Sequence, residues 1–362
     1  MYKIFSTFTG AGGLDIGFHG DFNFLGKEYK RLPFETVYAL EYNKDAIDSL
    51  AYNKKYFPNT NLLHKDITHN IDEELKKYPA KEFDVFLGGF PCVTFSVVGK
   101  QKGITDDVSG QLYESFAKYL EHLQPKVFLA ENVKGILSAN KGEAVKIIKK
   151  RFNLDGYNLK IFLVNFADFG VPQLRERVLF IGVRKDLNID FIPPEFTHKN
   201  NHVTANKAFE NLPINCKHTE HLKVSDKVVE RLKHIKEGSN FKDVENTPFA
   251  IKGLMSNIYR RLHGDKPAYT VIASGGGGTW GYHQKEYRPL TNRERARLQS
   301  FPDDFNFQGS TTEVRRQIGN AVPVVGIYHF AQRIQCVLDG ITPQYNPDNC
   351  IKEYDVEAKR FI

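Results

Sequence analysis

The sequence predicts an α/β fold with a parallel sheet, helices on both faces of the sheet, and a smaller second domain of irregular structure. Short β-rich runs alternate with helical patterns over the first half of the 362 residues, which is typical of parallel sheets. From residue 185 to 300 the periodicity fades, and His, Lys, Asn and Pro become frequent. The length also favours two lobes over a single core.

The elements expected in the first half follow from the spacing of apolar residues. We expect strands at Tyr2–Thr7, Thr36–Leu40, Phe83–Leu87, Val127–Ala130, Lys160–Val164 and Val178–Val183. We expect helices at Asp45–Lys55, Gln111–Leu123 and Gly142–Arg151. Helical spacing returns near Val314 and continues to Leu338. The domains predicted from these patterns are residues 1–184 with 315–362, and residues 185–314.

Composition excludes several classes of protein. Hydrophobic residues make up 41% of the chain, which is enough for a sizeable core. The four cysteines form no CxxC pair and no zinc spacing, so we expect no metal site and a reducing compartment such as the cytoplasm. No stretch reads as a signal peptide or as an apolar membrane span.

The positive charge is concentrated between residues 184 and 300. Residues 184–300 hold 20 Lys and Arg against 13 Asp and Glu, which accounts for the whole net charge of +7. Such a local excess suits a polyanion such as nucleic acid, although an ordinary basic surface explains the charge equally well.

A glycine-rich turn, Gly10-Ala11-Gly12-Gly13, follows the first strand. Glycines at this place let the backbone approach a ligand closely, and the turn lacks the GxGxxG pattern of dinucleotide sites. Glu41 follows the second strand and Asp66 a further one, so they are placed to hold a ribose and an adenine amino group. Each carboxylate alone reads as a surface residue. Together they favour a ribose–adenine cofactor without pyrophosphate, such as S-adenosylmethionine.

Cys92 follows a buried apolar strand and a proline, at the sheet edge where catalytic groups lie in α/β proteins. It is a candidate nucleophile, and the alternative is a buried, inert thiol. Glu131 ends the next strand, and a carboxyl group beside a thiolate suits acid–base work on a ring. Arg175 and Arg177 alternate along a strand and can hold a carbonyl oxygen or a phosphate.

Six segments together resemble the motifs of the DNA cytosine-C5 methyltransferases, in the family's order and near its spacing. They are Phe8–Phe18 (FTGAGGLDIGF), Gly89–Ser96 (GFPCVTFS), Glu131–Val133 (ENV), Gln173–Arg177 (QLRER), Arg288–Phe301 (RPLTNRERARLQSF) and Gln317–Pro323 (QIGNAVP). In size and layout the chain resembles bacterial or viral restriction-modification enzymes. Val93 departs from the family's usual Gln after the cysteine.

The resemblance implies a Rossmann-like S-adenosylmethionine-dependent methyltransferase fold, with residues 185–314 as the target-recognition domain. Cys92 would attack C6 of a cytosine flipped out of a duplex. Glu131 would hold the N3/N4 edge of the base, and Arg175 and Arg177 the base carbonyl and a phosphate. The methyl group would pass to C5, giving S-adenosyl-L-homocysteine.

The resemblance and the residues also give the remaining expected contacts. The cofactor residues are Phe8, Gly10, Gly12, Leu14, Glu41, Tyr42, Asp66, Ile67, Pro91, Leu112, Asn320 and Ala321. The DNA-binding residues are Ser96, Lys100, Gln173, Arg260, Arg261, Ser274, Gly275, Gly276, Gly277 and Thr279. The glycines of this second set would let backbone amides reach base edges, whereas the plainer reading is a flexible surface loop.

The partner implied is double-stranded DNA, with no membrane and no required partner protein. We expect a monomer, in a bacterial cytoplasm or an infected host cell, alongside a cognate restriction endonuclease acting on the same site. Two alternatives remain open from the sequence. One is a tRNA cytosine-C5 methyltransferase of the same fold, and the other is a non-catalytic DNA-binding regulator.

Overall fold

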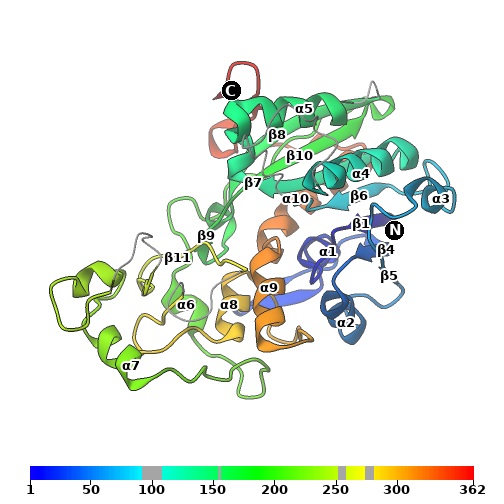
Figure 1. The fold of residues 1–362 in the computed structure, drawn as a ribbon. Coiled ribbons are helices and arrows are strands. Elements are labelled where there is room, and N and C mark those ends of the chain that lie inside the picture. The colour runs from blue at the N-terminus through cyan, green and yellow to red at the C-terminus, as the bar shows by residue number, and fades with distance from the viewer. Residues whose placement is uncertain (92–107, 154–155, 252–257, 274–280) are drawn as a thin grey trace, which may run out of the picture.

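A seven-stranded sheet forms the centre of the larger lobe (Figure 1). The computed structural model describes residues 1–91, 108–153, 156–251, 258–273 and 281–362. Within them the strand order is β5–β4–β1–β6–β7–β10–β8. The strands of this sheet are β1 (Tyr2–Thr7), β4 (Phe34–Glu41), β5 (Asn61–His64), β6 (Val85–Gly88), β7 (Val127–Val133), β8 (Tyr157–Asn165) and β10 (Glu176–Arg184).

The prediction of a fully parallel sheet is wrong at one strand. β5, β4, β1, β6 and β7 pair in parallel, but β10 is antiparallel to both of its neighbours, β7 and β8. Only residues 166–175 join β8 to β10, and they contain a 3₁₀ turn, η3 (Phe166–Phe169), and the short strand β9 (Gln173–Leu174). A parallel partner would need a crossover of a dozen residues or more, so this short link makes β10 run antiparallel.

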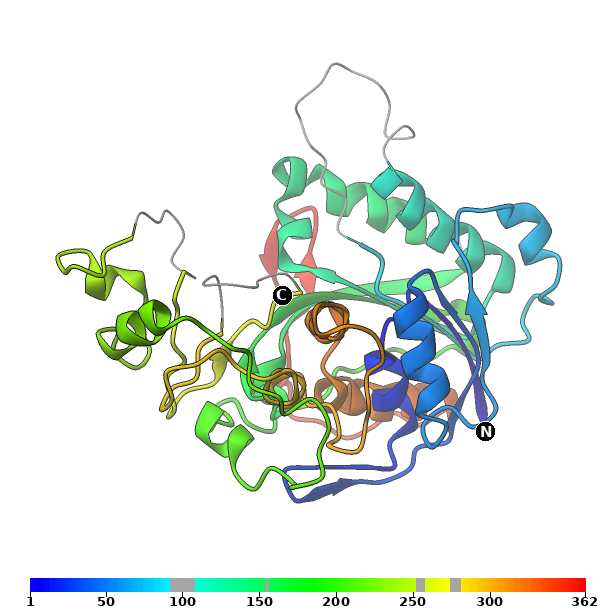
Figure 2. The same cartoon turned by 60° about the horizontal axis from the view of Figure 1, so that its bottom comes forward.

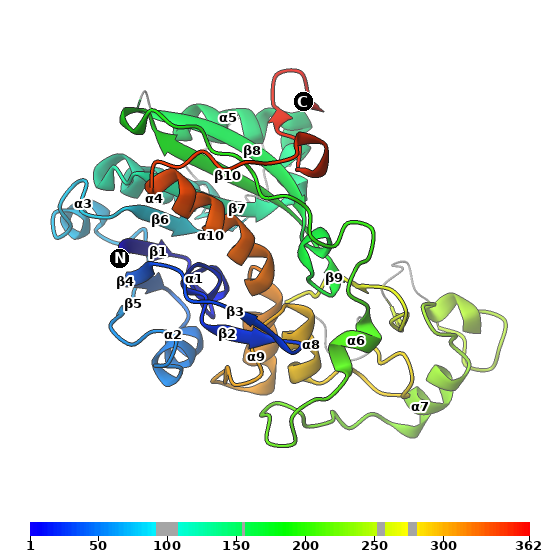
Figure 3. The same cartoon turned by 180° about the vertical axis from the view of Figure 1, so that it is seen from behind.

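Helices cover both faces of the sheet, as predicted (Figures 1 and 3). Alternate strand residues point to opposite faces, so Phe5 and Phe86 pack in one core while Ile4 and Leu87 pack in the other. The first core includes α3 (Ile71–Leu75), α4 (Val108–Leu123) and α5 (Glu143–Phe152). The second includes α1 (Gly13–His19), α2 (Lys44–Tyr52), α9 (Thr311–Asn320) and α10 (Val324–Leu338).

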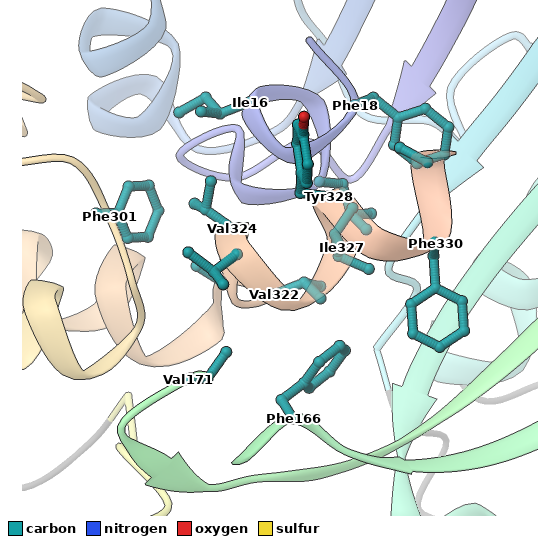
Figure 4. Packing of buried hydrophobic residues seen from close by; sticks show 14 of the residues in the cluster. Ile16, Phe18, Phe166, Val171, Phe301, Val322, Val324, Ile327, Tyr328 and Phe330 are labelled. Carbon is teal, nitrogen blue, oxygen red and sulfur yellow. The ribbon is translucent and has the colours of Figure 1, made fainter. Parts of the chain in front are cut away.

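The C-terminal helix α10 returns to the first part of the chain and packs against α1 (Figure 4). A Cβ atom at Gly17 of α1 would lie 2.8 Å from the carbonyl oxygen of Val324 and 2.8 Å from Ile327, so only glycine allows this approach. Val324, Ile327 and Phe330 are fully buried. Residues after 320 therefore complete the core built by the N-terminal half. The helix α1 was not predicted, because a seven-residue glycine-rich segment shows little apolar periodicity.

The smaller lobe lies to one side of the sheet and consists of short elements joined by long loops (Figure 2). This matches the irregular structure expected from its sequence.

No helix of the described residues is long and apolar enough to span a membrane. The remaining helices and strands are α6 (Ala205–Phe209), α7 (Asp226–Lys233), α8 (Asn292–Leu298), β2 (Phe22–Phe24), β3 (Lys27–Tyr29), β11 (Ala268–Tyr269), β12 (Tyr354–Asp355) and β13 (Arg360–Phe361).

Candidate active site

One cavity lies at the carboxyl ends of β4, β1, β6 and β7. Its volume is about 400 Å³, which is within the usual range for small-molecule sites. The glycine turn after β1 lines one part of it, and the Glu131 segment at the end of β7 lines another. Part of the residues predicted for cofactor binding therefore lines the same cavity as Glu131, Arg175 and Arg177, which were predicted for the chemistry.

The backbone of the turn after β1 is shaped for close approach. Phe8 has a φ of +52°, which is rare for an aromatic residue, and Gly10 has a φ of +55°. A Cβ atom at Gly13 would lie 2.3 Å from the carbonyl oxygen of Val322, so this glycine lets the turn pack against the chain before α10. Strained backbone often marks a binding site, and here it borders the cavity.

Glu41 is held with its carboxylate toward the same turn. Its Oε2 accepts a hydrogen bond from the Gly10 backbone N–H at 2.8 Å, and its Oε1 accepts one from the Asn43 N–H, also at 2.8 Å. Glu41 and Asn43 both line the cavity. Each carboxylate oxygen retains lone pairs, so Glu41 can still accept bonds from ribose hydroxyls.

The structure brings some predicted cofactor residues to the cavity and leaves others away from it. The lining includes Phe8, Gly10, Leu14, Glu41, Pro91, Asn320 and Ala321. Gly12, Tyr42, Asp66, Ile67 and Leu112 are not among the described lining residues. Tyr42 is 72% exposed, and Asp66 is an exposed residue that accepts bonds from the N–H and hydroxyl of Thr68. The cofactor role of these five residues stays a prediction.

Glu131 and Arg177 form a buried ion pair in the other part of the cavity. The Arg177 Nε atom lies 2.8 Å from Glu131 Oε1, and the side chains are only 13% and 9% exposed. Burial raises the pKa of Glu131 above its usual value, while Arg177 and Arg175 oppose that rise. A Cβ atom at Gly89 would come within 3.3 Å of Glu131 Oε2, so this glycine leaves room beside the second carboxylate oxygen.

Asn132 fixes the segment that leads to Cys92. Its side-chain Nδ2 donates to the carbonyl oxygen of Phe90 at 3.1 Å, and its Oδ1 accepts from the Val133 N–H at 2.8 Å. Pro91 lines the cavity. Cys92 itself lies outside the described residues. Seven predicted DNA contacts also lie outside them: Ser96, Lys100, Ser274, Gly275, Gly276, Gly277 and Thr279.

Arg175 is a cavity residue whose guanidinium is held by the protein itself. The side chain is 1% exposed. Its Nη1 donates to the carbonyl oxygen of Val271 at 3.0 Å, and its Nη2 donates to those of Gly319 and Ala321 at 3.0 and 2.9 Å. These bonds join the residue between β9 and β10 to the smaller lobe at Val271 and to the end of α9. Arg175 therefore has a structural role. Its predicted contact with the base or phosphate stays a prediction.

Replacing Arg175 with methionine should lower the free energy of unfolding by roughly 3 kcal/mol or more, because three buried carbonyls lose a charged donor. Urea denaturation measures this change. The matched control is Arg316→Met on the exposed face of α9, which should change stability by about 0.5 kcal/mol or less. Wild-type stability combined with lost DNA binding would instead show that Arg175 acts on the nucleic acid.

Two predicted DNA contacts are buried in the structure, which argues against that role for them. The Gln173 side chain is fully buried, and its Nε2 donates to the carbonyl oxygen of Leu298 at 2.6 Å. Arg261 is 6% exposed, and its guanidinium donates to the carbonyl oxygens of Ile235, His283 and Gln284. Both side chains already have partners inside the protein, which indicates a structural role, and their predicted contact with DNA stays a prediction.

Arg260 differs from its neighbour. Its guanidinium carbon lies 3.2 Å from the centroid of the Tyr269 ring, and the side chain is partly exposed. The Tyr269 hydroxyl donates to the carbonyl oxygen of Gly238 at 3.2 Å, so the ring is itself held in place. No hydrogen bond or ion pair joins the Arg260 side chain to another described residue.

Sequence reasoning missed several residues of the cavity. Thr9, Asn43, Arg316 and Gln317 line it but were not singled out. The signal was present for Gln317, since it begins the QIGNAVP motif, of which only Asn320 and Ala321 were assigned. Nothing in the local sequence marked Asn43, which also caps α2 by accepting a bond from the Ala46 N–H.

Comparisons with known proteins agree on one family. The family model of the C-5 cytosine-specific DNA methylases matches residues 2–336. The chain is 47% identical over 340 residues to the type II methyltransferase M.NgoFVII of Neisseria gonorrhoeae, covering 92% of this chain and 86% of that protein. It is also 47% identical over 253 residues to M.BbvI of Brevibacillus brevis, covering 68% of this chain and 67% of that one.

A solved structure has a similar fold. A crystal structure of a protein encoded within an Escherichia coli prophage aligns with a TM-score of 0.71 at 23% identity, over 94% of this chain and all of that one. The family predicted from the six motifs is therefore confirmed by a match over most of the chain. This chain belongs to the C-5 cytosine-specific DNA methylase family.

Proposed function

We propose that this protein transfers a methyl group from S-adenosylmethionine to C5 of a cytosine in a short specific site of double-stranded DNA. Family membership supports the reaction. The observation that carries the proposal for this chain is that the Gly10 turn, Glu41 and the Glu131–Arg177 pair line the same cavity. A methyl donor and its acceptor must meet within one water-excluded space.

The residues of the cavity fit S-adenosylmethionine. Glu41 would accept bonds from the two ribose hydroxyls, and the open turn at Gly10 leaves space for the methionine part. Asn320 and Ala321 would pack beside the same part from the end of α9. When bound, the cofactor supplies an electrophilic methyl group on a sulfonium centre.

The chemistry on cytosine would begin at Cys92. Its thiolate would add to C6, which makes C5 nucleophilic. The protonated carboxyl group of Glu131 would support this step by binding N3 and giving it the proton. C5 would then take the methyl group, with S-adenosylhomocysteine as the leaving group. The C5 proton would pass to water, the thiolate would leave C6, and N3 would return its proton to Glu131, which restores the aromatic ring. Arg177 holds Glu131 and would also bind the O2 carbonyl of the base. Burial of Glu131 favours the protonated form that this scheme needs.

The base must leave the duplex to reach this cavity, so the proposal includes base flipping. Residues 185–314 would form the target-recognition domain, and the basic excess of the chain lies within residues 184–300. We expect the protein to act as a monomer in the cytoplasm, and a cognate restriction endonuclease would share its site.

Replacing Arg260 with alanine should weaken DNA binding and reduce the slope of log K against log salt by about 1, because one phosphate contact is lost. Fluorescence anisotropy at several salt concentrations measures the slope. Lys76→Ala, at the exposed residue that follows α3 in the larger lobe, is the control and should leave the slope unchanged. An unchanged slope for both variants would place the DNA on another face.

Methyl transfer from labelled S-adenosylmethionine to unmethylated genomic DNA, followed by bisulfite sequencing, tests the proposed function. We expect cytosines in one short sequence context to be protected. Absence of protection, with a folded protein that still binds the cofactor, would contradict the proposal. Preferential labelling of tRNA would assign the activity to RNA instead.

A further inference from the structure

Asp15 is a buried carboxylate that the reaction does not use. It lies on α1 and is 0% exposed. Burial raises its pKa to about 6, although hydrogen bonds from Thr36 and Ser6 oppose the rise. No Lys, Arg or His of the described residues forms an ion pair with it. An unpaired carboxyl group is costly to bury, so its place in the core calls for an explanation.

The carboxylate joins three elements. Its Oδ2 accepts from the Ser6 hydroxyl of β1 at 3.1 Å, and its Oδ1 accepts from the Thr36 hydroxyl of β4 at 2.9 Å. The Thr36 hydroxyl also lies 2.8 Å from Nε2 of His19, at the other end of α1. The second ring nitrogen of His19 lies 3.0 Å from the carbonyl oxygen of Tyr56. Since that oxygen can only accept, Nδ1 carries the proton.

This buried network leads directly to the wall of the cavity. The Thr9 hydroxyl lies 3.1 Å from the Ser6 hydroxyl and 3.3 Å from the carbonyl oxygen of Leu40, and Thr9 lines the cavity. Leu40 precedes Glu41, whose carboxylate accepts the N–H of Gly10. Asp15 is thus two hydrogen bonds away from Thr9 in the turn, and one hydrogen bond, through Thr36, away from β4, the strand that carries Glu41.

We infer that Asp15 is a positioning residue for the cofactor: its carboxyl group locks α1 onto β1 and β4 and so fixes the relative placement of the Gly10 turn and Glu41. This inference rests on the proposed function, because it takes those two features as the cofactor contacts. Asp15 contacts neither the cavity nor the reacting atoms, so its effect falls on binding of the cofactor and not on the chemical step.

Calorimetric titration of the full-length protein with S-adenosylmethionine tests the inference. We expect Asp15→Ala to raise the Kd about tenfold, and Asp15→Asn to stay within about threefold of wild type, because the amide can still accept from Thr36 and can donate to Ser6. At saturating cofactor, kcat for Asp15→Ala should stay within twofold. A Kd within twofold of wild type for folded Asp15→Ala would overturn the inference.

The control is Glu74→Gln. Glu74 is also a buried carboxylate, 9% exposed, but it lies on α3 with Lys65, Lys77 and Tyr78 as partners, away from the cavity. It should leave the Kd unchanged, and a rise equal to that of Asp15→Ala would reduce the role of Asp15 to general stability. If Asp15→Ala does not fold, Thr36→Val tests the same link and should raise the Kd about fivefold.

A second readout separates this inference from the proposed function. Hydrogen exchange of the ligand-free protein should be at least tenfold faster over residues 8–14 in Asp15→Ala than in wild type, while α5 is unchanged. Equal exchange over residues 8–14 would overturn the positioning role, whether or not the cofactor binds. Failure of the wild-type protein to bind S-adenosylmethionine, with the exchange difference present, would count against the proposed function alone.

Discussion

Replacing Cys92 with alanine is expected to abolish methyl transfer, with a loss of more than about 10³-fold, because the proposed bond to C6 is formed by the Cys92 thiolate. Binding of S-adenosylmethionine should stay within a few-fold of wild type. The cofactor contacts proposed here lie on the turn after β1 and on Glu41, and neither depends on the thiol. Transfer of a labelled methyl group and calorimetric titration measure the two quantities separately.

Cys216→Ala is the matched control for this variant. Cys216 is a half-buried free thiol whose pKa is raised by burial, and its Sγ lies 3.2 Å from the carbonyl oxygen of Asp303. A thiol of this kind is a poor nucleophile, so the variant should keep wild-type activity. Residual methyl transfer by Cys92→Ala at a tenth of the wild-type rate would show that Cys92 is not the nucleophile. Loss of cofactor binding would make it a structural residue.

Replacing Glu131 with glutamine is expected to lower kcat by about 10²- to 10⁴-fold, which is the range for losing a positioned acid–base group. The amide has nearly the same shape but cannot protonate N3. The variant also leaves the charge of Arg177 in a buried place without its partner, so some stability will be lost. The rate must therefore be measured on protein shown to be folded by circular dichroism.

Glu176→Gln provides the control on the neighbouring strand. Glu176 precedes Arg177 but is 44% exposed and pairs with Lys134, so its loss should leave kcat within about twofold, as for other surface pairs.

The pH dependence of activity gives a further check on the role of Glu131. Because burial raises the pKa of Glu131, activity that needs its protonated form should fall as the pH rises through that raised value. A Glu131→Gln variant with wild-type kcat would exclude the acid–base role.

Regular apolar patterns made much of the sheet predictable. Tyr2–Thr7 was placed to the residue, and the strands expected at Val127–Ala130 and Val178–Val183 lie within β7 and β10. These strands are continuous apolar runs in the sequence because both of their faces are buried in the structure. The direction of β10 was not predictable in the same way, since periodicity carries no information on strand orientation.

The sequence indicated which residue types border the site, but it did not indicate what each side chain contacts. Cavity-lining Glu41, Glu131 and Arg177 were found because polar groups at successive strand ends stand out from apolar runs. Gln173 and Arg175 were read as ligand contacts, yet both are buried by segments more than 90 residues away. Local sequence shows which residues alternate along a strand but not what tertiary structure covers them, so such residues can be distinguished only in the folded chain.

Covalent trapping on DNA that contains 5-fluorocytosine is the most direct test of the central claim. With fluorine at C5, methyl transfer leaves no proton to lose, so the thiolate cannot leave C6 and the protein stays attached. We expect a denaturation-resistant complex that forms only with S-adenosylmethionine, maps to Cys92 by peptide mass spectrometry and is absent in Cys92→Ala. A protein that methylates ordinary DNA but gives no such complex, or attaches through another residue, would contradict the mechanism.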